Sequence, residues 1–258
     1  MSDASPHHPP TSNHQPLLRA VLTLVLAGVG LLVLGLVLGL ALVGRHGGGA
    51  IQGLDRRTGN WFLDHRYLVG VAKVVATFGD APALGVICLV LTIGLLIWRR
   101  SPVSLVPIVG FLGGEAFVFL IRQIIHRPRP ITANGSHALS GIHETSWSFP
   151  SGHATTVTAV LFACLGAVAL ARRAVWPWLL ALLASLYVAS TRLVLGVHWL
   201  SDVSVGLLLG LLWGITVAVV ATRLSWDELR YLVPARRNER PRQAVNTTTS
   251  LSGPPTGP

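Results

Sequence analysis

The chain has 258 residues, of which 51% are hydrophobic and only 12% are charged, and its mean hydropathy is +0.60. A soluble domain of this length carries roughly twice that charged fraction, so the composition excludes an ordinary soluble protein and predicts an all-α, polytopic membrane protein. The net charge of +10 comes from loops and the C-terminal segment rather than from a basic stripe interleaved with aromatic residues, which argues against a nucleic-acid partner.

The first expected element is a transmembrane helix. Residues 1–16 are polar and predict a disordered tail. Residues 20–44 then carry no charge and are long enough to cross a bilayer core of about 30 Å. The 45–80 segment contains no stretch that could span, and we expect one or two interfacial helices there.

Five further spans are expected, at 81–98, 102–121, 154–171, 174–189 and 203–222. The expected organisation is therefore an N-terminal tail (1–16), a six-span membrane domain (17–222) and a basic, mostly disordered tail (223–258).

The distribution of arginine predicts the orientation. Arg99-Arg100 and Arg172-Arg173 occupy the two shortest loops, and more arginines follow the last span. Positive loops stay in the cytoplasm, so we expect both termini there and the segments 45–80, 122–153 and 190–202 outside. Four arginines oppose this bias, which indicates an anionic ligand on the outer side; they are Arg122, Arg127, Arg129 and Arg192.

The segment 122–130 groups three of these arginines within eight positions. Arg122 ends an expected span, and Arg127 and Arg129 alternate with prolines that stiffen the exit from the helix. Planar guanidinium groups bind phosphate oxygens bidentately, so the three predict a phosphate clamp. The alternative is juxtamembrane positive charge facing lipid headgroups.

A second segment, Pro150-Ser151-Gly152-His153, stands directly before the next expected span. Ser151 is a good N-cap, and the free N–H groups of a first turn that begins at Gly152 form an anion site. His153 would lie at its mouth and could protonate a departing oxygen. Capping alone also explains the serine and the glycine.

The third segment is Thr191-Arg192, five residues, His198, three residues and Asp202. His198 and Asp202, four residues apart on a helical turn, share a face, so the carboxylate can orient the imidazole as a nucleophile or base. The alternative is a structural ion pair near a helix end. Orientation by Asp202 favours His198 over His153 as the nucleophile.

Glu115 is the only acid inside an expected span, and it lies seven residues before Arg122 on the same helical face. We hypothesise that it pairs with an active-site arginine or lines the substrate entry. A polar contact between helices is the alternative.

We expect neither a metal nor another cofactor. Metal-dependent phosphatases gather several carboxylates, whereas this chain has ten acids in all. A zinc site at His126, His143 and His153 is disfavoured because Arg127 and Arg129 would repel the cation.

Together, the three segments resemble the signature of the type 2 phosphatidic acid phosphatase superfamily, which includes bacterial membrane lipid phosphatases and is related to vanadium haloperoxidases. The first motif of that family usually opens with lysine, here Arg122, and the third with serine, here Thr191. Charge and hydroxyl are preserved, so neither departure removes a group that the chemistry needs.

The resemblance implies a role for each motif residue. His198 would attack phosphorus and form a phosphohistidine, Asp202 would fix its tautomer, and His153 would protonate the leaving oxygen and then activate water. The groups implied to neutralise the phosphate oxygens are Arg122, Arg129, Arg192, Ser151 and Gly152, with Arg127, Pro150 and Thr191 in supporting positions.

The implied activity is metal-independent hydrolysis of a lipid phosphate or pyrophosphate, such as undecaprenyl pyrophosphate, phosphatidylglycerol phosphate or phosphatidic acid, at the outer face of a bacterial plasma membrane. The alternatives are an anion-binding transporter, which would show discontinuous spans in matching halves, and a phosphotransferase or haloperoxidase-like oxidase on the same scaffold.

Overall fold

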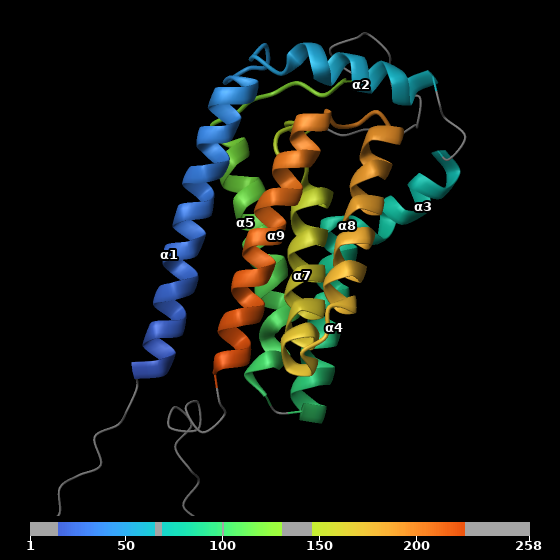
Figure 1. Cartoon of the computed structure of the whole chain (residues 1–258). Helices are drawn as coiled ribbons and strands as arrows, with labels where there is room; N and C mark the ends of the chain where they lie inside the picture. Colours follow the sequence, from blue (N-terminus) through green and yellow to red (C-terminus); the bar gives the residue numbers. More distant parts are fainter. Residues whose placement is uncertain (1–14, 65–68, 100, 131–145, 225–258) are drawn as a thin grey trace, which may run out of the picture.

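The protein is a bundle of long apolar helices with a polar helix lying across one end (Figure 1). The computed structural model describes residues 15–64, 69–99, 101–130 and 146–224, and no strand occurs among these residues. The main helices are α1 (Gln15–Leu38), α2 (Gln52–Asp64), α3 (Val69–Gly79), α4 (Ala81–Arg99), α5 (Val106–Arg122), α7 (Gly152–Arg172), α8 (Trp176–Val194) and α9 (Leu200–Arg223). A π-helical turn (Gly39–Val43) extends α1, and a 3-10 turn (Pro102–Leu105) leads into α5.

The six expected membrane spans are confirmed. Six helical segments are long and apolar enough to cross a bilayer, and the first includes the π-helical turn: Gln15–Val43, Ala81–Arg99, Pro102–Arg122, Gly152–Arg172, Trp176–Val194 and Leu200–Arg223. Their bounds differ from the expected ones by a few residues, as is usual for helix ends. Most of the expected tails, 1–16 and 223–258, falls outside the described residues.

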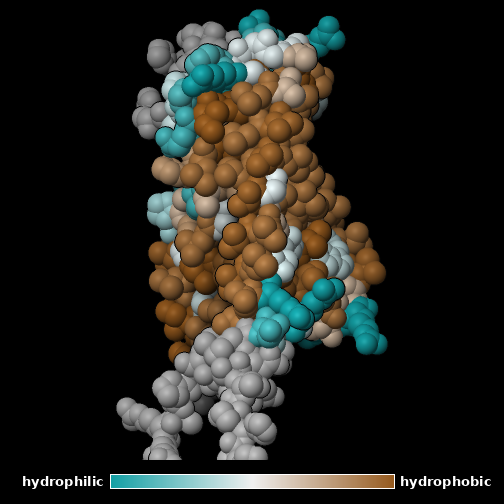
Figure 2. Space-filling view, turned by 90° about the vertical axis from the view of Figure 1, so that its left-hand side faces the viewer, coloured by the Kyte–Doolittle hydropathy of each residue, from teal (hydrophilic) through white to brown (hydrophobic). Residues whose placement is uncertain are grey.

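The outer surface of the bundle is apolar along most of its length. Figure 2 shows hydrophobic residues covering the middle of one face, with hydrophilic residues gathered near both ends. A helix that exposes leucine and valine over such a length is stable only against lipid, as along α1, most of whose large apolar side chains are exposed.

The 45–80 segment forms two helices. α2 crosses the end of the bundle opposite the start of α1 and the end of α9, and α3 descends obliquely beside α8 (Figure 1). α2 is polar, but Asp55 on it is completely buried. One face of α2 therefore packs against the bundle.

The centre of the bundle is α7, which packs against α5, α8 and α9. Small residues line these contacts and let the helix backbones approach closely, as is typical between membrane helices. Glycines that lie directly against the backbone of α7 are Gly114 of α5 and Gly210 and Gly214 of α9. This close packing fixes the start of α7 against the start of α9, where two of the three motifs lie.

We expect Gly210→Ala to destabilise the bundle. A Cβ atom at Gly210 would lie 2.3 Å from the carbonyl oxygen of Thr155, which is rigid helix backbone. The two helices would have to separate, at a cost of about 1–3 kcal/mol or more. Thermal unfolding in detergent should show a lowered Tm. Gly30→Ala is the matched control, because nothing lies within 4 Å of a Cβ there and alanine favours a helix. Equal Tm values for the two variants would contradict the role of Gly210.

Candidate active site

The three motif segments meet around one cavity of about 150 Å³. Its walls come from the end of α5, the start of α7, the loop between α8 and α9, and the junction of α3 with α4. The lining residues are Gly79, Asp80, Ala81, Glu115, Val118, Arg122, Arg129, Gly152, His153 and His198. Both histidines of the expected chemistry therefore face the same space as two arginines.

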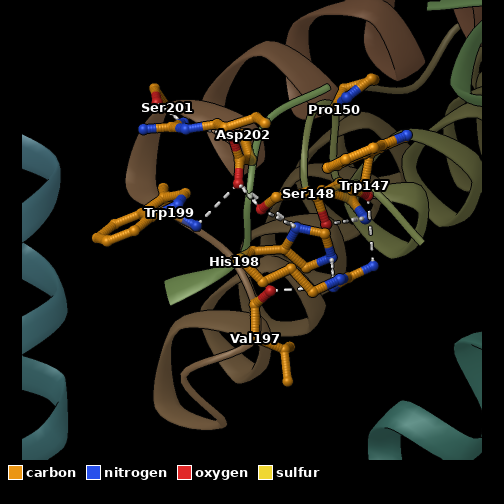
Figure 3. A network of polar contacts seen from close by, with 12 residues as sticks. Trp147, Ser148, Pro150, Val197, His198, Trp199, Ser201 and Asp202 are labelled. Atoms are coloured by element: carbon orange, nitrogen blue, oxygen red, sulfur yellow. Dashed lines mark hydrogen bonds and ion pairs between the residues drawn. The ribbon is translucent and has the colours of Figure 1, made fainter. Parts of the chain in front are cut away.

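His198 lies in the loop before α9 and not on a helical turn with Asp202, as the spacing had predicted, because the backbone is extended at Trp199. Its ring is held on both sides (Figure 3). Its Nδ1 atom is 3.6 Å from Oδ2 of Asp202, and its Nε2 atom is 3.0 Å from a guanidinium nitrogen of Arg129. A guanidinium can only donate, so Nε2 accepts and the ring proton belongs on Nδ1, toward the carboxylate. This tautomer directs the Nε2 lone pair into the arginine-lined cavity.

The electrostatic environment keeps this ring neutral. Burial lowers the pKa of His198 well below its ordinary value, and the positive charges of Arg129, Arg192 and Arg122 lower it further. The imidazole therefore carries an available lone pair at neutral pH, which is what a nucleophile needs.

Asp202 is fixed by more than the histidine. In the first turn of α9 its Oδ2 atom accepts the backbone N–H of Trp199 at 3.0 Å and the hydroxyl hydrogen of Ser148 (Figure 3). The hydroxyl oxygen of Ser148 also lies 3.5 Å from Nδ1 of His198. A carboxylate bound in this way cannot rotate, so the ring that it orients is also fixed.

Two guanidinium groups are held side by side by Ser146. Arg129 donates from Nε to the carbonyl of Ser146 at 2.8 Å and from a terminal nitrogen to its hydroxyl at 3.0 Å. Arg122 donates to the same hydroxyl at 3.2 Å and to the carbonyl of Pro150 at 3.0 Å. Two fixed cations beside Nε2 of His198 make the cavity suited to a phosphoryl group.

The start of α7, for which an anion site was predicted, lies at the cavity. Ser151 caps the helix, because its side chain accepts from the backbone N–H of Ala154, and its own N–H donates to the carbonyl of Asp202 at 3.1 Å. Gly152 opens the helix and lines the cavity; a Cβ atom there would lie 3.8 Å from Arg122. The first turn thus faces the guanidinium groups with no side chain between.

His153 is oriented by the end of α3. Its Nε2 atom lies 2.9 Å from the carbonyl oxygen of Ala76 and 3.2 Å from a carboxylate oxygen of Asp80. Ala76 and Asp80 offer acceptors at the shorter distances, which favours a proton on this nitrogen, while a terminal nitrogen of Arg192 lies farther away at 3.4 Å. Gly79 packs so closely that a Cβ atom would lie 2.6 Å from the ring. The two imidazoles therefore differ at Nε2: that of His198 accepts a hydrogen bond from Arg129, and that of His153 faces the acceptors Ala76 and Asp80.

Arg127 is not part of the expected three-arginine clamp. It is 3% exposed, does not line the cavity, and lies between the carboxylates of Asp55 and Asp202. Arg127 pairs with two buried carboxylates while Arg129 contacts His198 and Ser146, so only Arg129 of these two faces the cavity and the expectation was wrong for Arg127.

Arg192 and Thr191 also lie behind the cavity wall. Arg192 is buried, with a terminal nitrogen 3.4 Å from Nε2 of His153. The hydroxyl of Thr191 donates to the carbonyl of Val188 at 2.6 Å and so satisfies its own helix. These two residues contact the site from behind, and their expected contacts with phosphate remain predictions.

Glu115 lines the cavity and accepts the hydroxyl of Thr156 at 2.7 Å. Glu115 therefore faces the cavity, and it also forms a polar contact between α5 and α7. Within the described ranges, no group of three His, Cys, Asp or Glu side chains is arranged to hold a metal ion, and His143 lies outside those ranges.

Several residues of this site carry no recognisable sequence signal. Ser146 and Ser148 lie in a loop, and Asp55 stands on a helix far along the chain from the motifs. A buried acid looks like any exposed acid in a polar helical segment. Only the three-dimensional structure shows that Asp55 contacts Arg127 and Ser201.

Comparisons with known proteins find a family model and relatives similar to this chain. A family model described as the PAP2 superfamily matches residues 104–226. A decaprenylphosphoryl-5-phosphoribose phosphatase of Mycobacterium tuberculosis is 30% identical over 148 residues, which cover 57% of this chain and 77% of the relative. An undecaprenyl-diphosphatase of Sulfolobus acidocaldarius is 30% identical over 118 residues, or 45% of this chain and 54% of that protein.

The fold is similar to a solved one. The crystal structure of a transmembrane PAP2-type phosphatidylglycerolphosphate phosphatase from Bacillus subtilis matches with a TM-score of 0.61, covering 81% of this chain and 98% of the other at 22% identity. At that identity the similarity concerns the arrangement of helices alone.

Proposed function

This chain belongs to the PAP2 superfamily, and we propose that it removes the terminal phosphate of a membrane lipid through a phosphohistidine on His198. It is a multi-pass membrane protein and a phosphate-ester hydrolase of that family. The observation that carries the proposal is the cavity itself, where Nε2 of His198, the protonated nitrogen of His153 and two arginines converge.

In the first step, the Nε2 lone pair of His198 forms a bond to phosphorus while the bond from phosphorus to the leaving oxygen breaks. The electron pair of that bond goes to the leaving oxygen, which takes a proton from His153 in its imidazolium form and leaves that ring neutral. Arg129 gives up its hydrogen bond to Nε2 and donates instead to a phosphoryl oxygen. Arg122 donates to a second phosphoryl oxygen. Asp202 stabilises the positive charge that develops on the imidazole.

In the second step, His153, now neutral, accepts a proton from water as the water oxygen attacks phosphorus. The nitrogen–phosphorus bond breaks and its electron pair returns to Nε2 of His198. Inorganic phosphate leaves, and both histidines regain their starting protonation states. No step in this cycle needs a metal ion.

The lipid nature of the substrate is supported by position. The cavity lies where apolar helices end, so a headgroup could enter it while its chains stay along the bundle. The relatives named above are phosphatases of prenyl-linked phosphates. We therefore propose a lipid monophosphate or pyrophosphate, with a polyprenyl carrier as the first class to test and phosphatidylglycerol phosphate and phosphatidic acid as the second.

We also propose that the enzyme lies in a bacterial plasma membrane with its cavity on the outer face. The cavity is lined by the start of α7, which lies toward α2, whereas the first residues of α1 and the last residues of α9 lie at the opposite end of the bundle (Figure 1). Arg99 and Arg172 end α4 and α7 on that opposite side. The positive-inside rule assigns that side to the cytoplasm.

The function is tested with purified protein in detergent micelles. We expect release of inorganic phosphate from decaprenyl or diacylglycerol phosphates at an unchanged rate in EDTA, because histidine and arginine supply every group in the proposed cycle. Vanadate, which mimics the pentacoordinate transition state, should inhibit competitively. Loss of activity in EDTA with recovery on adding a divalent cation would refute the metal-independent mechanism.

A further inference from the structure

Asp55 is the completely buried acid of a helix that is otherwise largely exposed. Its Oδ1 atom accepts the backbone N–H of Ser201 at 2.9 Å, and its Oδ2 atom accepts the hydroxyl of Ser201 at 2.6 Å. A buried carboxylate is costly unless each oxygen is bound. Asp55 thus ties α2 to the first turn of α9, next to the catalytic loop.

The second partner of Asp55 is Arg127. One terminal nitrogen of this guanidinium lies 2.6 Å from Oδ2 of Asp55, and the other lies 2.5 Å from Oδ1 of Asp202. The latter nitrogen also donates to the hydroxyl of Ser201 at 2.7 Å, and the group lies over the ring of Trp199. The planar group is therefore held rigidly between two carboxylates, both completely buried.

These contacts determine what Asp202 offers to His198. Arg127 occupies Oδ1 of Asp202, so only Oδ2 remains for the imidazole, at 3.6 Å from Nδ1. Without Asp55, the positive charge of Arg127 would neutralise the negative charge of Asp202, and no net negative charge would remain beside the imidazole of His198. Asp55 supplies a second negative charge, so that the chain Asp55–Arg127–Asp202 keeps a net charge of −1 beside His198.

We infer that Asp55 is a positioning residue for the phosphatase reaction, acting on His198 through Arg127 and Asp202, and that α2 is therefore part of the catalytic apparatus. The inference rests on the proposed role of His198 as nucleophile. Positive charge develops on the imidazole as the nitrogen–phosphorus bond forms, and the net charge of the chain stabilises it. Asp55 does not line the cavity, so it should act on the chemical step rather than on substrate binding.

The test begins with Asp55→Asn, which keeps the shape of the side chain and removes its charge. We expect kcat to fall about 10–100-fold, the usual effect of losing a group that orients a reactive residue, with KM changed less than about twofold. Arg57→Gln is the matched control, since it removes a charge from an exposed neighbour on the same helix, and it should match the parent protein. An unchanged kcat, or a raised KM alone, in Asp55→Asn would overturn the inference.

A double-mutant cycle separates positioning from general damage to the fold. Arg127→Gln leaves two buried carboxylates facing each other without a cation. Adding Asp55→Asn removes one of those charges, so the double variant should be more active than Arg127→Gln alone. Losses that simply multiply would show that the two residues act independently.

A measurement without substrate keeps this inference distinct from the proposed function. In histidine-labelled protein, ¹⁵N chemical shifts report the tautomer of His198, assigned by comparison with His198→Gln. The parent should hold its proton on Nδ1, and Asp55→Asn should shift protonation toward Nε2. An unchanged tautomer would overturn the inference even in an active phosphatase. A parent protein that releases no phosphate would overturn the proposed function, while the tautomer shift still decides the role of Asp55.

Discussion

Replacing His198 with alanine should abolish turnover, with a loss of at least about ten-thousand-fold, comparable to removal of a covalent nucleophile in other enzymes. The reason is specific to this site. Nε2 of His198 is the nitrogen whose lone pair faces the arginines, and burial together with Arg129 lowers the pKa of this ring, so that it is neutral at pH 7. Without it, no covalent intermediate can form.

The measurement is trapping of the phosphoenzyme with ³²P-labelled substrate. The parent protein should incorporate an acid-labile, alkali-stable label, as phosphohistidine does, and His198→Ala should incorporate none. His126→Ala is the control, because this ring stacks on Trp147 outside the cavity and should retain both label and turnover. A labelled His198→Ala variant would show that another residue is the nucleophile.

Replacing His153 with alanine should lower hydrolysis of a lipid phosphate by about a hundred- to ten-thousand-fold, the contribution of a general acid. His153 lines the cavity, and its Nε2 atom is held by the carbonyl of Ala76 and the carboxylate of Asp80, which is the position proposed for the general acid. A lipid alkoxide is a poor leaving group and needs the proton of that acid.

The leaving group distinguishes this role from simple damage to the site. p-Nitrophenolate departs without protonation, so His153→Ala should still complete its first turnover on p-nitrophenyl phosphate. The second step, which needs His153 to activate water, should then be slow. Rapid mixing should show a burst of one equivalent of p-nitrophenol per enzyme followed by slow turnover. Absence of the burst, with equal losses on both substrates, would contradict the role as acid.

The helices could be predicted from the sequence because the physical constraint on each is local. An uncharged stretch such as 20–44 must cross the bilayer as a helix, since the backbone has no other way to satisfy its hydrogen bonds in lipid. The same holds for Ser151, whose capping of α7 depends on residues within one turn. Helix bounds shifted by a few residues because frayed ends depend on packing as well as on composition.

The neighbourhoods of side chains could not be predicted in the same way. Arg127 and Arg129 are chemically alike and two positions apart, yet one lines the cavity and the other lies between two buried carboxylates. Asp80 is a helix-start residue in sequence and a partner of His153 in space. The direction in which each side chain points is set by contacts between segments tens of residues apart.

The amino-acid order by itself determined the membrane class, the six spans and the resemblance to a phosphatase superfamily, since each depends on composition or on local motifs. The spacing of His198 and Asp202 suggested their pairing, but the helical turn expected for the two residues is absent, because His198 lies in the loop before α9 and Asp202 in its first turn. Tertiary structure alone decided that Asp55 of α2 reaches the start of α9, that Ser146 holds Arg122 beside Arg129, and that α3 ends against His153. Buried charges must find partners wherever the packed helices bring them, and that packing is a property of the whole bundle.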